Sequence, residues 1–423
     1  MKKEIIYGID FGTSNSLLSA SIDKVPCPPI PLDDHHLEKS ILRSLMYIPK
    51  KGKAYFGHQA IEKYTEEEGE GRFIRSIKKY LPKQSFKGTQ INGKVYTLEN
   101  IVSRFLAEMK TRADAHFGQE VDSVILGRPA KYSQNPEEDT LAEKRMRSAA
   151  ELAGFKHIEF LPEPLAAAYD FRKSLKEEKI VLMVDLGGGT SDFTIIRLHP
   201  KLWTQDDVLS LGGISVAGDD LDGAIMEKKI AIHFGSEVRY KFPFSDNFLT
   251  MPPSLRLHLS SPADIVQLSR SDIMSFLTEV KKCKLNNEDD ERMEQLFDLI
   301  QENLGFALFD HIEKLKIDVC SKTQGFFHFE TESILVDEEY SREEFENHIY
   351  SKTEKIFACL DEVIQQASLK TQQIDLICCT GGTSKVPLVQ QKLIERFGEE
   401  KINTYSSFQS VIQGLAEKAT QNH

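Results

Sequence analysis

A glycine-rich pattern occurs twice in this chain, at residues 7–15 and again at residues 183–192. Each copy begins as an apolar strand that ends in an aspartate, which is Asp10 in the first copy and Asp185 in the second. An apolar residue, a glycine turn, hydroxyl side chains and a second strand follow in both. Two copies of one motif, about 175 residues apart, favour two similar lobes that face each other across a cleft. The repeat therefore predicts an α/β fold with a duplicated core.

Apolar periodicity places the elements around these two copies. Residues 98–116 carry apolar side chains at helical spacing, which predicts an amphipathic helix. The stretch 219–340 is mostly helical in pattern, with a short strand pair near residues 326–336. A capping box at residues 341–344 opens a helix that runs to about residue 367. The last predicted helix covers residues 409–419.

Composition excludes several classes of function. The 423-residue chain carries a formal net charge of −12, with basic and acidic residues interspersed. Binding to nucleic acid or to an anionic membrane takes a basic stripe, so neither is an expected partner. The longest apolar runs are too short to cross a bilayer, and the N-terminus leads into a strand without a signal-peptide core. Six cysteines form no CxxC pair, so we expect reduced thiols in a soluble, cytoplasmic protein.

The two glycine turns are candidate phosphate-binding loops. They are Gly12-Thr13-Ser14 and Gly187-Gly188-Gly189-Thr190. Glycine lets backbone N–H groups approach an anion closely, and the neighbouring hydroxyls add hydrogen-bond donors. The chain contains no GxxxxGK[ST] sequence, so a P-loop is not the source of phosphate binding. A pair of ordinary hairpin turns is the alternative interpretation.

Three aspartates flank these turns, namely Asp10, Asp185 and Asp192. Magnesium bound to a nucleotide keeps several waters and takes only one or two carboxylates from the protein. Acids beside a phosphate loop are therefore candidate ligands of metal-bound water, or bases that orient a water molecule. Carboxylates that merely cap the turns are the alternative. A third glycine turn, at residues 381–383, follows a predicted strand and is a candidate nucleoside site.

Five segments resemble those of the DnaK-type heat-shock chaperones, in the same order and at similar spacing across essentially the whole chain. They are residues 8–16, 162–168, 184–192, 313–316 and 380–387. Residues 127–129, 153–155, 313–317 and 408–415 further resemble the short YegD-type branch of that family. The resemblance implies the two-lobed actin-like ATPase fold, with duplicated ribonuclease-H-like domains and a nucleotide cleft between the lobes. It also implies ATP or ADP with magnesium, and potassium as a further candidate cofactor.

The resemblance assigns roles to individual residues. Phosphate binding falls to Gly12, Thr13, Ser14, Asn15, Gly187, Gly188, Gly189 and Thr190. Adenosine binding falls to Gly218, Glu313, Lys316, Gly381, Gly382, Thr383 and Lys385. Asp10 and Asp192 would bind magnesium through water.

The resemblance also implies how hydrolysis would proceed. Lys78 would orient the attacking water and neutralise the γ-phosphate, with Lys79 as the alternative lysine. Glu163 and Asp185 would position and polarise that water. The segments at Pro129 and Glu163 would couple closure of the cleft to the nucleotide state.

Domain boundaries follow from the repeat and the resemblance. We expect lobe I over residues 1–178, joined by the terminal helix within 404–423, and lobe II over residues 179–403 with a mostly helical subdomain at about 219–340. No peptide-binding domain is expected after this fold. Two positions depart from the family pattern. Ile317 replaces an arginine that stacks on adenine, and Phe408 replaces an acidic residue.

Three functions remain open on the sequence alone, because a fold by itself does not define an activity. The first is a chaperone-like ATPase whose lobes open and close with the nucleotide state to act on a partner or client protein, with a co-chaperone or exchange factor. Slow turnover is expected for it. The second is a nucleotide-bound scaffold or pseudo-ATPase. The third is a small-molecule kinase of the sugar-kinase type, for which the sequence offers no further substrate motif.

Overall fold

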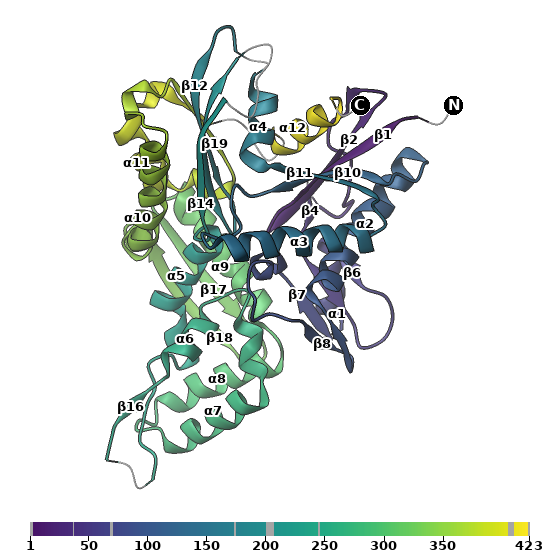
Figure 1. Ribbon diagram of the computed structural model, residues 1–423. Coiled ribbons are helices and arrows are strands. Elements are labelled where there is room, and N and C mark those ends of the chain that lie inside the picture. The colour runs from purple at the N-terminus through teal and green to yellow at the C-terminus, as the bar shows by residue number, and fades with distance from the viewer. Residues whose placement is uncertain are drawn as a thin grey trace. The chain divides into compact units, whose positions relative to one another are not determined.

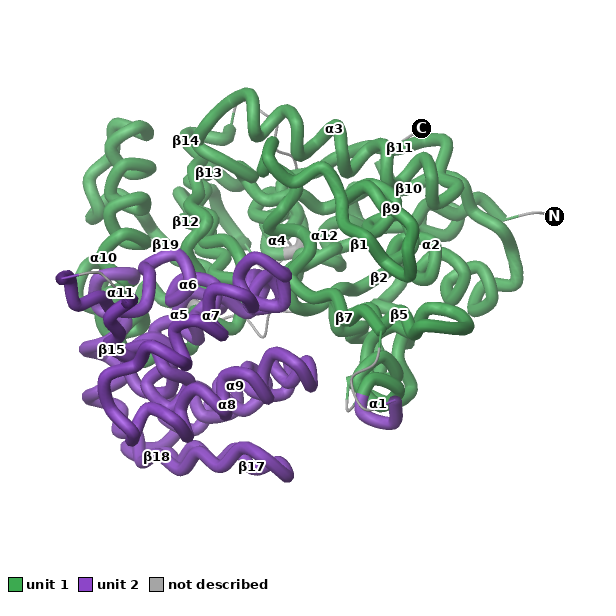
Figure 2. The backbone as a smooth tube through the Cα atoms, turned by 90° about the horizontal axis from the view of Figure 1, so that it is seen from below, with its two compact units in different colours: residues 1–64, 71–218, 353–423 green, residues 65–70, 219–352 purple. Residues whose placement is uncertain are grey.

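The computed structural model describes residues 3–36, 38–67, 71–172, 175–199, 207–243, 246–404 and 410–421. The chain forms two compact units, which Figure 2 distinguishes by colour. Unit 1 comprises residues 1–64, 71–218 and 353–423, and unit 2 comprises residues 65–70 and 219–352. Both copies of the glycine-rich pattern lie in unit 1.

The first large sheet of unit 1 contains the first copy. Its strands lie in the order β11-β10-β1-β2-β3, with β4 also paired to β2. Strand β1 is parallel to β10 and antiparallel to β2, and β10 is parallel to β11. The bounds are Ile5–Phe11 for β1, Asn15–Ile22 for β2, Val25–Pro26 for β3, Leu42–Arg43 for β4, Ser123–Arg128 for β10 and His157–Pro162 for β11.

The second large sheet repeats this topology. Its order is β14-β13-β12-β19-β20, in which β12 is antiparallel to β13 and parallel to β19. The bounds are Lys179–Leu186 for β12, Ser191–Leu198 for β13, Val208–Ile214 for β14, Leu376–Thr380 for β19 and Ile402–Thr404 for β20. Phe11 pairs with Ser16 in the first sheet and Leu186 with Ser191 in the second, so the two glycine turns have equal length. The predicted duplication is thus confirmed at the level of strand order and register.

Helices α2 (Leu98–Phe117) and α3 (Pro136–Leu152) pack on each other beside the first sheet (Figure 1). Thr97 caps α2 through the N–H of Asn100, and Gly118 ends it in the left-handed region. The ring of Phe105 on α2 lies 5.3 Å from that of Phe11 on β1. The helix predicted over residues 98–116 is confirmed, because its apolar stripe has this sheet to pack against.

The C-terminal helix α12 (Ser410–Ala419) packs on α4 (Glu163–Phe171) and on β1, beside which it lies in Figure 1. Val411, Ile412 and Leu415 are buried in a core that includes Ala166. A Cβ added at Gly414 would overlap the carbonyl oxygen of Ala166, so the two helix backbones are in direct contact.

The compact units divide the chain differently from the predicted lobes, whose boundaries stay a prediction.

Smaller elements complete unit 1. A three-stranded sheet has the order β6-β5-β7, and β8 and β9 form a hairpin. The bounds are Met46–Ile48 for β5, Tyr55–Phe56 for β6, Arg72–Ile74 for β7, Thr89–Ile91 for β8, Lys94–Tyr96 for β9, His58–Glu66 for α1 and Pro387–Phe397 for α11. Short 3-10 helices cover Ile77–Tyr80, Thr371–Gln373, Gly382–Lys385 and Glu399–Lys401.

Unit 2 is mostly helical, and its strand pair β17 (Gln324–Glu330) and β18 (Leu335–Ser341) packs on α9. The other bounds are Gly218–Ile225 for α5, Pro253–Leu259 for α6, Ser271–Cys283 for α7, Asp289–Gln301 for α8, Gly305–Ser321 for α9, Arg239–Tyr240 for β15 and Leu249–Thr250 for β16. Single-turn helical segments cover Met226–Ile230, Ala231–Phe234 and Ile265–Ser269.

Helix α10 (Arg342–Gln366) begins at the predicted capping box. The N–H of Glu344 donates to the Ser341 hydroxyl at 3.1 Å, and the N–H of Ser341 donates to the Glu344 carboxylate at 2.8 Å. Among the described residues, no helix combines the length and the apolar character needed to cross a membrane.

Candidate active site

The two glycine turns of unit 1 lie against each other. Thr13 belongs to the turn between β1 and β2, and Gly189 to the turn between β12 and β13. A Cβ added at Gly189 would overlap the Thr13 side chain, with the methyl carbon of that threonine only 3.0 Å away. Any larger residue at position 189 would therefore push Thr13 aside. The repeat predicted two such turns, and the tertiary structure brings them into contact.

The third glycine turn joins the second one. The carbonyl oxygen of Gly187 accepts hydrogen bonds from the Thr383 hydroxyl at 2.8 Å and from the N–H of Gly218 at 3.1 Å. Gly381 has a φ of +81°, and a Cβ at that position would lie 3.0 Å from the nitrogen of Gly187. Only glycine suits both the backbone angle and this close approach. Four of the predicted nucleotide-binding residues thus form one connected cluster.

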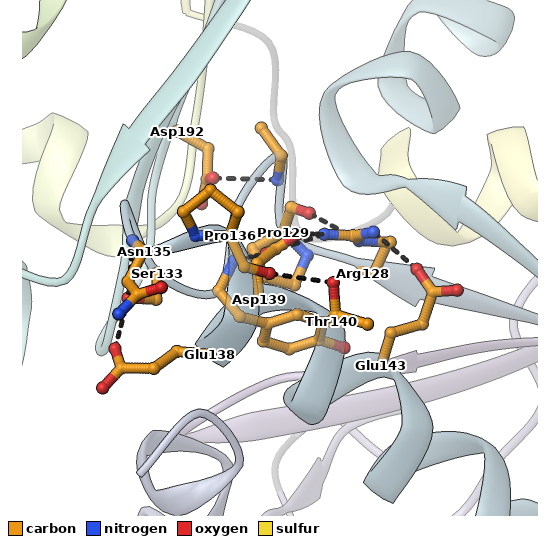
Figure 3. Close-up of polar contacts among 12 residues, drawn as sticks. Arg128, Pro129, Ser133, Asn135, Pro136, Glu138, Asp139, Thr140, Glu143 and Asp192 are labelled. Atoms are coloured by element: carbon orange, nitrogen blue, oxygen red, sulfur yellow. Dashed lines mark hydrogen bonds and ion pairs between the residues drawn. The ribbon is translucent and has the colours of Figure 1, made fainter. Parts of the chain in front are cut away.

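Asp192 on β13 connects the second sheet to the segment that follows β10. Its Oδ1 accepts a hydrogen bond from the N–H of Ala130 at 2.9 Å (Figure 3). Its Oδ2 is buried and has no hydrogen-bond partner among the described residues. A Cβ at Gly213 would lie 2.5 Å from Oδ1, so the neighbouring strand needs a glycine there. A buried carboxylate oxygen without a partner is costly, and a hydrated cation would satisfy it.

Lys78 and Glu163 form a buried ion pair. The Lys78 Nζ lies 2.7 Å from the Glu163 Oε1, and their side chains are 7% and 9% exposed. Lys78 lies in the 3-10 helix Ile77–Tyr80, whereas Glu163 is the first residue of α4. Burial opposes the charge of Lys78, but the negative charges of Glu163 and Asp10 outweigh this, so the pKa of Lys78 is raised. The lysine is therefore a permanent cation in this site.

Asp192 is buried and Asp10 and Asp185 are half-buried, and each of these three predicted aspartates has a raised pKa. Burial is the largest cause for all of them, and the charge of Glu163 is the next. The pKa of Asp185 is raised to about 6 and that of Asp10 to about 8, while the pKa of Asp192 lies well above its usual range. Four carboxyl groups thus share this region with the ammonium of Lys78. Such a donor set fits a magnesium ion, whose charge would favour the ionised form of these carboxyl groups.

Sequence reasoning missed two residues that support this site, Arg128 and Tyr132. Arg128 Nη2 lies 3.0 Å from both carboxylate oxygens of Asp139, and its Nη1 lies 2.6 Å from Glu143 (Figure 3). Asp139 also accepts a hydrogen bond from the N–H of Tyr132 at 2.6 Å. The Arg128 guanidinium lies 5.2 Å from the centre of the Tyr132 ring. The sequence signal that could have indicated a partner for Arg128 is the four-residue spacing of Asp139 and Glu143. This spacing places the two acids on one face of α3.

Tyr132 itself lies close to the Lys78–Glu163 pair. Its hydroxyl is buried and has no hydrogen-bond partner among the described residues. Burial raises the pKa of Tyr132, and the charges of Lys78 and Glu163 shift it in opposite directions. The hydroxyl therefore stays protonated and can donate a hydrogen bond within the site.

The remaining predicted residues lie in both units. Gly382 and Lys385 are exposed in unit 1, in the 3-10 helix that follows β19. Glu313 and Lys316 lie on α9 in unit 2, where the Lys316 Nζ is 2.8 Å from the Asp222 carboxylate. Their participation in one adenosine site stays a prediction.

Three further predicted positions have different environments. Ile317 is 59% exposed on α9. Lys79 is half-buried beside the buried Lys78. Phe408 lies outside the described residues.

Two sheets of identical strand order, with glycine turns in contact and acids at the strand ends, define the actin-like ATPase fold. The family model described as "Hsp70 protein" matches residues 53–240 and 290–420. The chain therefore belongs to the Hsp70 family, which confirms the resemblance seen in its sequence. The narrower assignment to the YegD-type branch stays a prediction.

Curated relatives are similar to this chain at low identity. The chaperone protein DnaK of Mycoplasmopsis pulmonis is 24% identical over 421 residues, covering 98% of this chain and 58% of the relative. The heat shock 70 kDa protein 13 of Homo sapiens is 24% identical over 371 residues, covering 84% and 72%. The chaperone protein HscA of Buchnera aphidicola is 24% identical over 433 residues, covering 98% and 58%. The chain thus spans 58% of the length of the DnaK and HscA proteins that it matches.

Proposed function

We propose that this protein binds ATP and hydrolyses it slowly, and that it acts on a partner protein through lobes that open and close with the nucleotide state. The observation that carries the proposal is the contact between the two glycine turns, beside the buried pair of Lys78 and Glu163. Membership of the Hsp70 family supports ATP as the nucleotide and magnesium as its cation. The partner is proposed only as a client or co-chaperone of unknown identity, in the cytoplasm.

The glycine turns would bind the phosphates through backbone N–H groups and the hydroxyls of Thr13, Ser14 and Thr190. Asp10 and Asp192 would bind magnesium through its water shell, and the unpartnered Oδ2 of Asp192 supports this role. When bound, magnesium supplies positive charge that offsets the phosphate oxygens. Potassium is a candidate second cation.

Hydrolysis would depend on positioned charge, because phosphoryl transfer needs alignment and electrostatic stabilisation more than covalent chemistry. Lys78 would stabilise charge on the γ-phosphate and orient the attacking water. Glu163 positions the lysine through the 2.7 Å ion pair. Asp185, with a pKa of about 6, is mostly ionised at pH 7 and can accept a hydrogen bond from that water.

Nucleotide binding should stabilise the fold. A ligand that binds only the native state adds RT ln(1 + [L]/Kd), which is about 2.7 kcal/mol at a hundredfold excess over Kd. We expect millimolar Mg-ADP or Mg-ATP to raise the Tm measurably in differential scanning fluorimetry, and ADP with EDTA to raise it less. An unchanged Tm in millimolar Mg-ATP would contradict the proposed function as a whole.

Asp10→Asn should weaken magnesium dependence and nucleotide binding together, because it removes an acceptor for metal-bound water. Without nucleotide the variant should be at least as stable as the parent, since burial already favours the neutral form of Asp10. A raised native pKa lowers stability as pH rises from about 4 towards 8, and the asparagine variant lacks the contribution of Asp10 to this pH dependence. Calorimetric titration of Mg-ADP and thermal melts between pH 5 and pH 8 measure the two effects.

Asp34→Asn is the matched control for this variant, since the Asp34 side chain is exposed and far from any glycine turn along the chain. It should bind Mg-ADP like the parent. If Asp10→Asn also binds Mg-ADP with the parent affinity at every magnesium concentration, Asp10 does not contact the metal shell.

An assay of phosphate release separates the proposed function from its alternatives. The parent should hydrolyse ATP above background in the absence of any small-molecule acceptor. Tight nucleotide binding with no turnover would indicate a scaffold instead. Turnover that appears only with a member of a sugar panel, together with a phosphorylated product, would indicate a kinase.

A further inference from the structure

Arg145 on α3 organises the segment that follows Lys78. Its Nη1 lies 3.2, 2.9 and 3.0 Å from the carbonyl oxygens of Tyr80, Leu81 and Lys83, and its Nη2 lies 2.9 Å from that of Phe86. One guanidinium thus donates hydrogen bonds to four main-chain carbonyl groups within the seven consecutive residues 80–86. The planar guanidinium presents five N–H donors in a fixed geometry. A lysine in this place would offer a single point of contact.

The bound segment is continuous with the backbone of Lys78. The N–H of Leu81 donates to the carbonyl of Lys78 at 3.1 Å, and the N–H of Lys83 donates to the carbonyl of Tyr80 at 3.1 Å. The N–H of Phe86 in turn donates to the carbonyl of Lys83 at 3.1 Å. These residues form a chain of tight turns without the regular ladder of a long helix. Its shape therefore depends on the Arg145 guanidinium, which donates hydrogen bonds to these carbonyl groups.

The environment of Arg145 explains why this contact is strong. Its side chain is 10% exposed, so water competes little for the guanidinium at the part-buried carbonyl groups of Tyr80, Leu81 and Phe86. Glu99 on α2 lies 3.4 Å from the Arg145 Nε and balances its charge. Helix α3 packs on α2, so the guanidinium is anchored to the layer of helices beside the first sheet.

We propose that Arg145 is a positioning residue for hydrolysis, which fixes Lys78 by organising residues 78–86. The inference rests on the proposed function, in which Lys78 acts on the γ-phosphate. Arg145 touches no nucleotide in this proposal. Arg145 acts through the backbone of residues 78–86, which orients the Lys78 side chain toward Glu163 and toward the reacting phosphate.

Arg145→Gln and Arg145→Lys test the proposal. Displacing a catalytic group by about 1 Å can cost about a hundredfold in rate. We expect turnover to fall about tenfold or more in Arg145→Gln and less in Arg145→Lys, with the affinity for Mg-ADP within about twofold of the parent. In the Lys78→Ala background, Arg145→Gln should cause no further loss in single-turnover measurements, because the residue through which it acts is gone.

Hydrogen exchange gives a readout that does not depend on activity. The amides of Leu81, Lys83 and Phe86 should exchange faster in Arg145→Gln, while those of strand β1 should not change. Arg147→Gln is the matched control on the same helix. Its guanidinium donates to the carbonyl of Ile158 and lies over Phe160, away from residues 78–86 along the chain. This control should keep parent turnover and parent exchange at Leu81.

The outcomes distinguish a failure of the proposed function from a failure of the positioning role of Arg145. If the parent shows no turnover, the proposed function fails, and the exchange data still decide whether Arg145 organises the segment. If the parent is active, parent-like turnover or parent-like exchange in Arg145→Gln overturns the positioning role. A loss that multiplies with that of Lys78→Ala also overturns it, because Arg145 would then act elsewhere.

Discussion

Lys78→Ala should lower ATP turnover by about a hundredfold or more, which is the scale of losing one preorganised electrostatic contact at a reacting group. Nucleotide binding should fall far less, because the proposed contacts of the glycine turns with the phosphates do not involve the lysine. The buried pair with Glu163 makes Lys78 a fixed cation in the site. Single-turnover hydrolysis and calorimetric titration of Mg-ADP, made on the same preparation, measure this asymmetry.

Lys79→Ala is the matched control, since Lys79 is the next residue and only half-buried. It should retain parent turnover. If Lys78→Ala hydrolyses ATP at the parent rate and Lys79→Ala does not, the assignment moves to Lys79. If both variants are fully active, neither lysine acts on the γ-phosphate.

Stability must be followed in the same experiment. Lys78→Ala leaves the Glu163 carboxylate buried without its cation, which costs about 3 kcal/mol or more. The double variant Lys78→Ala with Glu163→Gln removes that charge, so it should melt closer to the parent and still lack turnover. Activity that returned in the double variant would show that misfolding, and not loss of the lysine, had lowered the rate.

Gly414→Ala should destabilise the protein by about 3 kcal/mol or more, the upper range for overpacking in a core. Alanine is a better helix former than glycine by about 1 kcal/mol, so an exposed helix would gain stability from this change. At Gly414, however, the new Cβ would overlap the carbonyl of Ala166 on α4. Neither group can rotate away, because the position of each is fixed by its helix backbone. Urea or thermal unfolding measures the difference.

Gly382→Ala is the control for this prediction. Among the residues that the structure describes, no heavy atom lies within 4 Å of a Cβ added at Gly382, and the φ of Gly382 is not in the left-handed region. The substitution should change stability by no more than about 0.5 kcal/mol. A Gly414→Ala protein as stable as the parent would contradict the close packing of α12 on α4.

The duplicated fold could be predicted from sequence because its signals are local. A strand that ends in aspartate and turns through glycine specifies the same hairpin in both copies, with Phe11 paired to Ser16 and Leu186 to Ser191. The helix at residues 98–116 and the capping box before α10 are equally local. The compact units were not predictable in this way, because unit 1 combines three separate stretches of the chain.

The candidate site was only partly accessible to sequence. Motifs located the glycine turns and the aspartates, and the structure brings Asp10, Asp185 and Asp192 close enough to Glu163 for their charges to interact. The sequence also offered Lys78 and Lys79 as alternatives. The structure buries Lys78 against Glu163, although its catalytic role remains a prediction.

The sequence by itself determined the duplicated strand–turn–strand units and the residue types at the turns, because each follows from a pattern within about ten residues. It also determined the family, because five such short segments occur in the family order. Only the tertiary structure decided which groups meet across long stretches of chain. Lys78 and Glu163 are 85 residues apart, and Ala130 and Asp192 are 62 apart. Arg145 binds carbonyl groups up to 65 residues away. Such contacts leave no periodic signal, because they form only after packing has offset the entropy of closing these loops.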